Sequence, residues 1–289
     1  MFYSRVGVVT GANKGIGLAI VRQLALQYPE SVLNNGPFLI YLTARSAHRG
    51  QAALRNLQED AQLKAAKALA ADGGLSEIRF HDLDITDSSS IRSFTEHVGR
   101  AHPDGIDFVI NNAGIAMQGF DSDVVKTTLG CNYYSTLEAC HAFLPLLKPH
   151  GRLVNVASTA GKLGSGYSEE IRSRFLSSKT EADVTSILKD FALAVETGSE
   201  KEVGFPSAAY AVSKAGLIGA TRALAMAEKE RGNNVLINSC CPGYVNTDMT
   251  RGRGSKTPDE GAQTPVMLAI GDLKDQTGRF WKDKKHENW

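Results

Sequence analysis

A tyrosine and a lysine four residues apart are the residues in this sequence best suited to chemistry. Tyr210 and Lys214 lie in a run of small and apolar residues typical of a helix, so their spacing places both side chains on one helical face. A phenol has an ordinary pKa of about 10, and a nearby ammonium lowers that pKa by stabilising the phenolate. The pair predicts an acid–base catalyst for an alcohol or a carbonyl oxygen. An exposed pair on a surface helix has the same spacing, so the rest of the chain must decide.

A glycine-rich turn follows the first apolar segment of the chain. Residues 6–10 are predicted to form a buried parallel strand, and an apolar helical run begins at Leu18. Gly11, Gly15 and Gly17 stand between them and allow a tight turn with a close backbone approach to a ligand. A pyrophosphate fits at the start of such a helix, where free N–H groups point outward. The segment predicts a dinucleotide site, with a plain strand-to-helix turn as the alternative.

Positive side chains follow the second predicted strand, residues 38–43. A site for NAD usually carries a carboxylate at this place, which binds the ribose 2′-hydroxyl. This chain has Arg45 there instead, with Arg49 four residues later and Lys14 inside the glycine-rich turn. Because guanidinium groups bind phosphate oxygens well, these residues favour NADP(H) over NAD(H). The alternative is that both arginines are ordinary surface residues.

Four further strands are predicted over residues 78–84, 106–110, 152–158 and 235–240. Asp84 ends the first of these, and the sequence leaves open whether it accepts a hydrogen bond from an adenine or caps the next helix. Ser158 ends the third. Ligands of open α/β sheets bind beyond the carboxyl ends of the strands. The side chains at these ends therefore belong to one predicted cleft.

The segments between the strands have helical periodicity. Helices are predicted over residues 51–71, 88–102, 124–147, 207–231 and 259–270, with a short last strand near 278–281. Asn132 lies inside the third helix, where a mediocre helix former needs an exposed face or a role. The strand–helix alternation stops between Ser158 and Tyr210, where two polar helical segments indicate an insertion. We expect a single α/β domain over residues 1–289, a Rossmann-type doubly wound parallel sheet with a helical insertion over about 160–206.

The composition of this 289-residue chain argues against several classes of protein. The formal net charge is +1 without a long block of like charge, so neither nucleic acid nor an anionic membrane is expected as a partner. The four cysteines have neither disulfide-framework nor metal-site spacing, so we expect no metal and a reduced, cytoplasmic setting. Neither a secretory signal nor a membrane span is recognised. The neighbours Cys240 and Cys241 are interpreted as a partly buried structural pair, with thiol regulation as the alternative.

Taken in chain order, these motifs resemble the short-chain dehydrogenase/reductase superfamily over nearly the whole chain. The resemblance rests on the glycine-rich turn, the Asn-Asn-Ala-Gly segment 111–114, Ser158, the pair of Tyr210 and Lys214, and the Pro-Gly step at 242–243. Within the superfamily, the sequences around these motifs are similar to the monomeric NADPH-dependent carbonyl reductases, as is the long insertion. The resemblance implies that the insertion covers a helical face by which other members dimerise, and therefore that this chain is a monomer.

The resemblance also implies a role for each site residue. Tyr210 would donate a proton, Lys214 would lower its pKa and bind the nicotinamide ribose, Ser158 would bind the substrate carbonyl, and Asn132 would support a water that links Lys214 to solvent. Besides Tyr210 and Lys214, the residues expected to bind NADP(H) are Gly11, Asn13, Lys14, Gly15, Ile16, Gly17, Arg45, Arg49, Asp84, Ile85, Asn112, Pro242, Gly243, Val245 and Thr247.

The sequence therefore predicts an NADPH-dependent carbonyl reductase that transfers hydride to a ketone, an aldehyde or a quinone. One alternative is an NADP-dependent alcohol or steroid dehydrogenase working oxidatively, which would use the same residues. The other is a non-catalytic protein that senses NADPH, and the complete set of four catalytic residues argues against it. Residues 117–120 depart from the pattern of the family, so the identity of the small-molecule substrate is not predicted.

Overall fold

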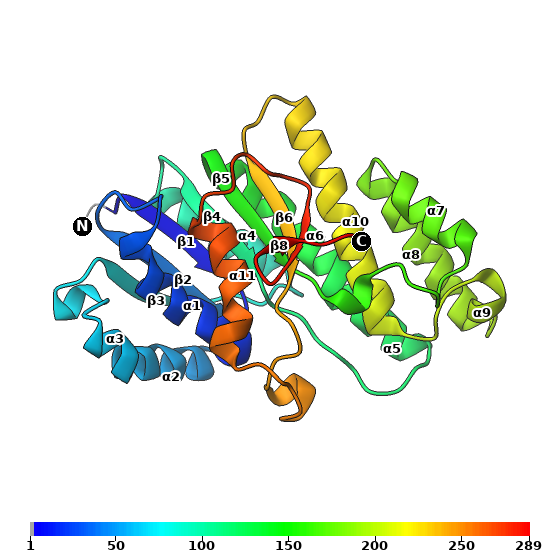
Figure 1. Ribbon diagram of the computed structural model, residues 1–289, viewed down its shortest axis with the longest axis horizontal. Coiled ribbons are helices and arrows are strands. Elements are labelled where there is room, and N and C mark those ends of the chain that lie inside the picture. Colours follow the sequence, from blue (N-terminus) through cyan, green and yellow to red (C-terminus); the bar gives the residue numbers. More distant parts are fainter. Residues whose placement is uncertain (1–2) are drawn as a thin grey trace.

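An eight-stranded sheet forms the centre of the protein, whose computed structural model describes residues 3–289. The strand order is β3-β2-β1-β4-β5-β6-β7-β8, and all neighbours are parallel except β7 and β8. The strands are β1 (Arg5–Val9), β2 (Phe38–Ala44), β3 (Ser76–Asp82), β4 (Ile106–Asn111), β5 (Leu147–Val156), β6 (Leu236–Cys241), β7 (Phe280–Lys282) and β8 (Lys285–His286). The order reverses between β1 and β4, so the predicted doubly wound α/β fold is confirmed (Figure 1).

Helices cover both faces of this sheet. The longer ones are α1 (Gly15–Gln27), α2 (Ala47–Gln58), α4 (Ser88–Ala101), α5 (Ser122–Leu129), α6 (Thr136–Phe143), α7 (Glu169–Ser177), α8 (Glu181–Glu196), α10 (Ala209–Glu230) and α11 (Pro258–Ile270). Helices α1, α2 and α11 pack on one face, and α4, α6 and α10 pack on the other (Figure 1). The side chains of β1 show why, since Val8 points into the core under α4 and Val9 into the core under α1.

The predicted helix over residues 51–71 is wrong, because the chain breaks it into shorter pieces. Helix α2 ends at Gln58, and Asp60 then caps a new short helix, α3 (Ala61–Ala65), by accepting hydrogen bonds from the next backbone N–H groups. A short 3-10 segment, η2 (Ala70–Asp72), follows. Asp60 caps the start of a new helix, although the apolar periodicity of the sequence continues across it. The periodicity alone therefore does not reveal the break.

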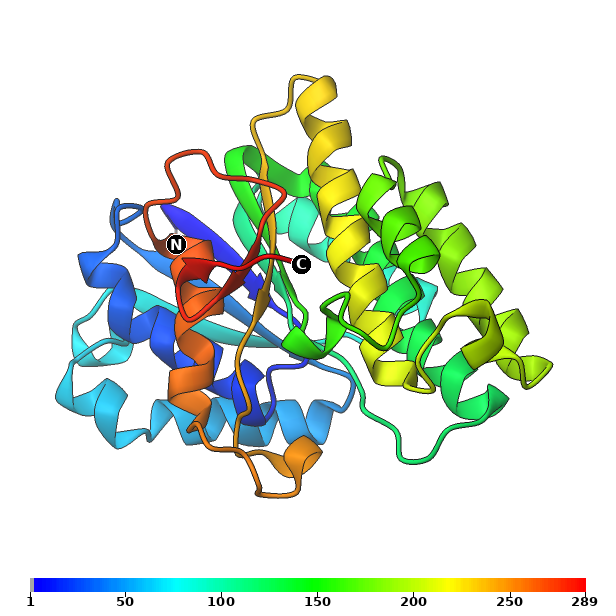
Figure 2. The ribbon, with the colours of Figure 1, turned by 45° about the vertical axis from the view of Figure 1, so that its right-hand side comes forward.

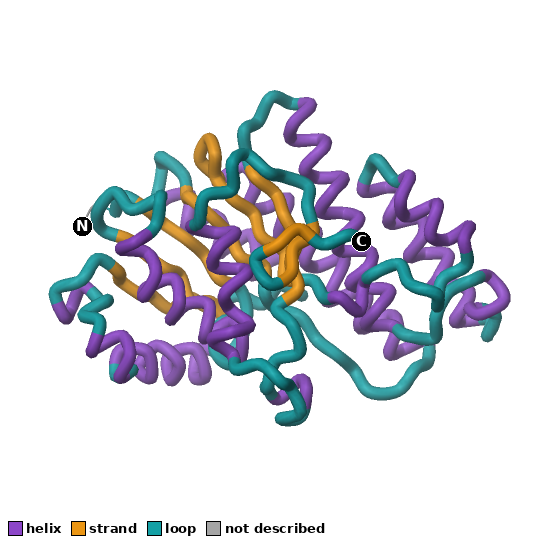
Figure 3. The backbone as a smooth tube through the Cα atoms, in the orientation of Figure 1, coloured by secondary structure: helices purple, strands orange, loops and turns teal. Residues whose placement is uncertain are grey.

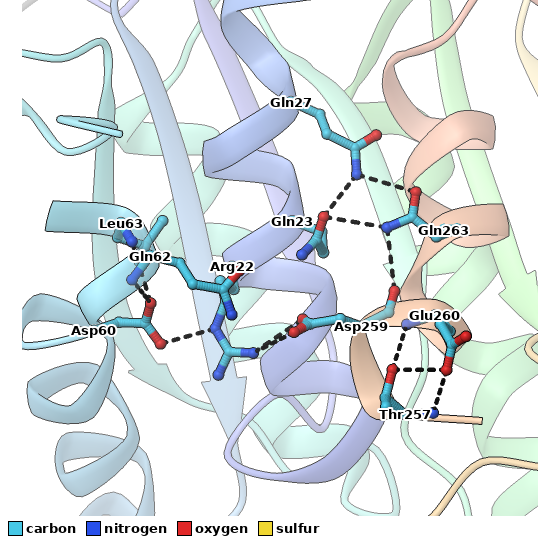
Figure 4. Close-up of polar contacts among 10 residues, drawn as sticks. All are labelled: Arg22, Gln23, Gln27, Asp60, Gln62, Leu63, Thr257, Asp259, Glu260 and Gln263. Carbon is cyan, nitrogen blue, oxygen red and sulfur yellow. Dashed lines mark hydrogen bonds and ion pairs between the residues drawn. The ribbon is translucent and has the colours of Figure 1, made fainter. Parts of the chain in front are cut away.

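The same carboxylate belongs to a polar network that fastens α1 to its neighbours (Figure 4). Arg22 of α1 donates to Asp60 at 2.9 Å and to both carboxylate oxygens of Asp259 in α11 at 2.9 and 3.0 Å. A capping box between Thr257 and Glu260 begins α11 one turn away. The network fixes α1, and with it the glycine-rich turn at its start, against two other helices.

The predicted helix over 124–147 is interrupted at its middle. It runs as α5, then a π-helical segment, η3 (Gly130–Ser135), then α6 and a 3-10 turn, η4 (Leu144–Leu146). Strand β5 begins at Leu147, earlier than the predicted residue 152. Asn132 lies in the π-helical segment, a kind of distortion that is frequent at functional sites.

Three helices occupy the stretch where an insertion is predicted: α7, α8 and the short α9 (Glu200–Val203). They lie on the outer side of α10 (Figure 2). Helix α8 packs against both α5 and α10, and its Leu188 and Phe191 share an apolar core with Val212 of α10. Within residues 3–289, the helices include none that is long and apolar enough to cross a membrane.

Candidate active site

A cavity of about 880 Å³ opens at the carboxyl ends of the strands. Its walls come from the turns after β1, β2 and β3, from α10, and from the long loops after β4 and β6, which Figure 3 shows below the sheet. The predicted site residues that line it are Gly11, Asn13, Lys14, Gly15, Ile16, Gly17, Arg45, Arg49, Asp84, Ile85, Asn112, Tyr210, Lys214, Pro242 and Thr247. The predicted residues Asn132, Ser158, Gly243 and Val245 are outside this lining. Because Arg45 and Tyr210 both line this cavity, a single ligand in it could contact both.

The glycine-rich turn has a conformation that side chains would prevent. Gly11 has a φ of +61°, and a Cβ at Gly17 would lie 2.5 Å from the side-chain nitrogen of Asn112. That nitrogen donates to the carbonyls of Thr10 at 3.0 Å and Gly11 at 3.1 Å. In return, the Thr10 hydroxyl accepts from the backbone N–H groups of Asn112 and Ala113. Thr10 thus joins the turn after β1 to the loop after β4. The sequence signals this role only by a polar residue at the end of an apolar strand.

The end of the cavity near β2 carries positive charge. Arg45 and Arg49 are exposed and line the cavity, and neither makes an ion pair with any residue in 3–289. Ser46 between them caps α2 and also lines the cavity, although it was not predicted. Lys14 differs from the two arginines, because its ammonium pairs with Asp248 of the loop after β6 at 2.6 Å. The predicted third charge is therefore neutralised across the mouth of the cavity.

Asp84 follows β3 and lines the cavity without capping a helix. One of its carboxylate oxygens accepts from the backbone N–H and the hydroxyl of Thr86, at 2.9 and 2.7 Å. The cap of α4 is Asp87, which accepts from the backbone N–H of Ser89. Of the two roles that the sequence left open for Asp84, the helix cap belongs to Asp87.

Tyr210 and Lys214 stand in the first turns of α10, as predicted. The Lys214 ammonium lies 5.7 Å from the centre of the Tyr210 ring and donates to the carbonyl of Val156 at 2.8 Å. Burial raises the pKa of Tyr210 to about 12, and the neighbouring Ser158 side chain partly opposes that rise. Burial lowers the pKa of Lys214 to about 8. With a pKa of about 12, the phenol of Tyr210 is protonated at neutral pH.

Asn132 is fully buried and joins the loop after β4 to the catalytic helix. Its side-chain oxygen accepts from the N–H of Ile115 at 2.8 Å, and its nitrogen donates to the carbonyl of Ile115 at 2.9 Å and to the Ser213 hydroxyl at 3.1 Å. These contacts explain why an asparagine is tolerated inside the helical segment. The water-supporting role implied by the resemblance stays a prediction.

Ser158 lies just beyond β5 and caps a short 3-10 turn, η5 (Thr159–Gly161). Its hydroxyl oxygen accepts from the N–H of Ala160 at 3.1 Å, and the hydroxyl can also donate its hydrogen. The turn presses on α10, since a Cβ at Gly161 would lie 2.5 Å from the carbonyl carbon of Lys214. The turn that begins at Ser158 is therefore packed directly against the backbone of α10 at Lys214.

Two predicted residues of the loop after β6, Val245 and Gly243, lie where the surrounding atoms leave little space for a larger side chain. Val245 is buried and packs against Gly261 of α11, so its contact with a ligand in the cavity would come from the backbone. Gly243 has a φ of +90°, and a Cβ there would lie 2.8 Å from the Lys256 side chain. Both shape the loop that carries Pro242 and Thr247 into the cavity.

The cysteines near the site are buried and unpaired. Cys240 and Cys241 have exposures of 0% and 2%, and burial raises the pKa of the Cys240 thiol. These surroundings favour the structural interpretation of the pair. Cys131 lines the cavity and was not predicted. Among residues 3–289, His, Cys, Asp and Glu side chains form no group of three or more that could hold a metal.

Comparisons with known proteins agree on one family. The family model described as short chain dehydrogenase matches residues 5–169 and 193–258, and its gap falls on α7 and α8. The carbonyl reductase (NADPH) 3 of Rattus norvegicus is 40% identical over 296 residues and covers 99% of both chains. The carbonyl reductase (NADPH) 1 of Homo sapiens is 37% identical over 294 residues and covers 98% of both chains.

Solved structures share the fold. The salutaridine reductase of Papaver somniferum superposes with a TM-score of 0.80 at 24% identity and covers 96% of this chain and 99% of that chain. The NADPH-bound carbonyl reductase from chicken fatty liver superposes with a TM-score of 0.66 at 23% identity and covers 100% of this chain and 96% of that chain.

Proposed function

The chain belongs to the short-chain dehydrogenase family, and from that premise we propose that it is an NADPH-dependent carbonyl reductase. The observation that carries the proposal is one cavity with two chemically different ends. Unpaired guanidinium groups of Arg45 and Arg49 lie at one end, and Tyr210 with Lys214 lies at the other. Relatives that match nearly the full length of this chain bear the name carbonyl reductase with NADPH as cofactor. The names agree with the cofactor and the reaction that the sequence predicts.

The residues around the cavity fit NADP(H). The start of α1 offers backbone N–H groups without helical partners, and the conformation of Gly11 keeps the backbone open to a pyrophosphate there. Arg45 and Arg49 would bind the ribose 2′-phosphate, because their charge is not used by a carboxylate of the described chain. When bound, NADPH supplies the hydride for the reaction. The protein would bind and orient the cofactor and the substrate, and would protonate the carbonyl oxygen.

Tyr210 is the proposed proton donor. With a pKa of about 12, its phenol holds its proton at neutral pH and can release it to a carbonyl oxygen as negative charge develops there. Ser158 would donate its hydroxyl hydrogen to the same oxygen and stabilise that charge. The nearby Lys214 ammonium would stabilise the phenolate that remains after the transfer. Asn132 would keep the loop at Ile115 in place while this happens.

A spectrophotometric assay of NADPH oxidation tests the proposal. A panel of quinones, aromatic aldehydes and α-dicarbonyls is offered with NADPH and, in parallel, with NADH. We expect turnover with NADPH well above that with NADH. Faster oxidation of alcohols by NADP⁺ than reduction of any carbonyl in the panel would instead support the oxidative dehydrogenase. Tight NADPH binding without turnover in either direction would support the sensor.

We also propose that the chain acts as a single-domain monomer in the cytoplasm. Helix α8 of the insertion covers α5 and α10 with an apolar core, so these helices have little apolar surface left for a second chain. The four free and buried cysteines fit a reducing compartment. Size-exclusion chromatography with light scattering should give the mass of one chain across a concentration series. A stable mass of two chains would contradict the role assigned to the insertion.

A further inference from the structure

The segment after β7 turns back and ends beside the loop that carries Ser158. Strand β8 pairs antiparallel with β7, and the N–H of Glu287 donates to the carbonyl of Phe280 at 2.9 Å. The end of the chain marked C then lies next to α10 in both ribbon views (Figures 1 and 2). Residues 285–289, here named the return segment, thus reach the catalytic helix from the far edge of the sheet.

Trp289 makes the first of two contacts between the return segment and the loop that begins at Ser158. Its indole N–H donates to the carbonyl of Gly161 at 2.9 Å. Its ring packs over Gly219 of α10, where a Cβ would lie 3.1 Å from the ring. Phe175 of the insertion meets the ring edge-on with centroids 5.8 Å apart, and the Arg222 guanidinium lies 5.2 Å from the ring centre. The ring is therefore held from three sides, and its N–H has a fixed direction.

A second contact ties the return segment to the same loop. Glu287 pairs with Lys162, the residue after η5, at 2.5 Å. Both partners are partly exposed, so this pair contributes less than the indole contact. The pair nevertheless shows that the return segment contacts the loop at two successive residues, Gly161 and Lys162.

The Gly161 carbonyl is connected to Ser158 by the hydrogen bonds of one short turn. The N–H of Gly161 donates to the Ser158 carbonyl at 3.0 Å, and the N–H of Ala160 donates to the Ser158 hydroxyl oxygen at 3.1 Å. On its other side, Gly161 touches the backbone of Lys214. A shift of the Gly161 peptide would therefore change where the Ser158 hydroxyl points.

We propose that Trp289 is a positioning residue for Ser158, acting through its indole hydrogen bond to the Gly161 carbonyl. The inference rests on the proposed role of Ser158 as the group that binds the substrate oxygen. Trp289 is not among the residues that line the cavity, so the proposed effect on Ser158 passes through the hydrogen bond to the 3-10 turn.

The first test uses millisecond hydrogen exchange with mass spectrometry on Trp289→Phe. This variant keeps an aromatic ring in place but loses the N–H donor. The matched control is Trp281→Phe, which loses an indole hydrogen bond to Asn238 at 3.2 Å and packs in the separate core under α1 and α11. We expect faster exchange in the peptide over 158–162 for Trp289→Phe and not for Trp281→Phe. Equal exchange in that peptide for wild type and Trp289→Phe would overturn the proposal.

The second test is a double-mutant cycle on kcat/KM for a carbonyl substrate. Trp289→Phe should lower kcat/KM by about fivefold, close to the effect of one neutral hydrogen bond, with the NADPH dissociation constant unchanged. In a Ser158→Ala background the same change should have no further effect, because the group that Trp289 positions is gone. An equal loss in both backgrounds would show a general structural role and overturn the proposal. Full activity of Ser158→Ala alone would refute the role of Ser158, while the exchange experiment would still report on the turn.

Discussion

At the scale of single residues, Lys214 has the least ordinary surroundings in the site. Its exposure is 5%, and within residues 3–289 it has no carboxylate partner. Its ammonium donates to the Val156 carbonyl and lies near the Tyr210 ring. Burial lowers its pKa from 10.5 to about 8. The folded protein without cofactor therefore binds fewer protons than the unfolded chain between these two pH values. In that window, the free energy of unfolding should rise with pH.

The Lys214→Met variant isolates this effect. It lacks the titrating group, so the stability difference between wild type and variant should shift in favour of wild type by up to about 3 kcal/mol between pH 8 and 10.5. Urea denaturation of both proteins at several pH values measures the difference, and the other titrating groups cancel. A stability difference that stays constant with pH would mean that folding does not lower the pKa of Lys214.

Arg45 is the residue on which the choice of cofactor should depend. Arg45→Asp places a negative charge where the 2′-phosphate is expected, so the ratio of kcat/KM for NADPH over NADH should fall by at least about tenfold. Arg55→Asp is the matched control. Arg55 is exposed like Arg45, but it lies on α2 and outside the cavity lining. An unchanged ratio in Arg45→Asp would assign phosphate recognition to other residues.

At the scale of elements, the π-helical segment η3 is the feature that connects sequence to site. It turns Asn132 towards Ile115 and Ser213, and so links the loop after β4 with α10. Sequence periodicity predicts a helix here but does not reveal the extra residue in the turn. The split of the predicted helix at 51–71 has a similar cause, because Asp60 acts as a cap and the apolar pattern continues across it.

Asn132→Ala tests the element. It leaves the partly buried N–H and carbonyl of Ile115 without their side-chain partner, so the free energy of unfolding should fall by about 1–3 kcal/mol. Carbonyl reduction should slow as well, because Ile115 lines the cavity. Denaturation curves and steady-state rates measure both effects. Asn34→Ala, a change in an exposed loop, should leave both within error, and equal behaviour of the two variants would contradict the linking role of Asn132.

At the scale of the whole molecule, the sequence predicted the strands and the cavity residues better than the contacts between distant segments. Apolar runs with glycine or polar ends locate the strand ends, and the parallel fold then brings those ends together. The pair of Lys14 with Asp248 and the contact of Trp289 with Gly161 join residues far apart in the chain. Their formation depends on loop conformations, for which the sequence carries no periodic signal. The substrate side of the cavity is unpredicted for the same reason.

In the proposed reaction, Tyr210 donates the proton to a carbonyl oxygen. Tyr210→Phe keeps the ring and removes only the hydroxyl, so NADPH should bind as in wild type. The measurement is the single-turnover rate of carbonyl reduction, with the NADPH dissociation constant measured by titration on the same preparation. We expect the rate to fall by at least about a hundredfold while the dissociation constant stays the same. A variant that keeps most of the wild-type rate would contradict the assignment of Tyr210 and the mechanism built on it.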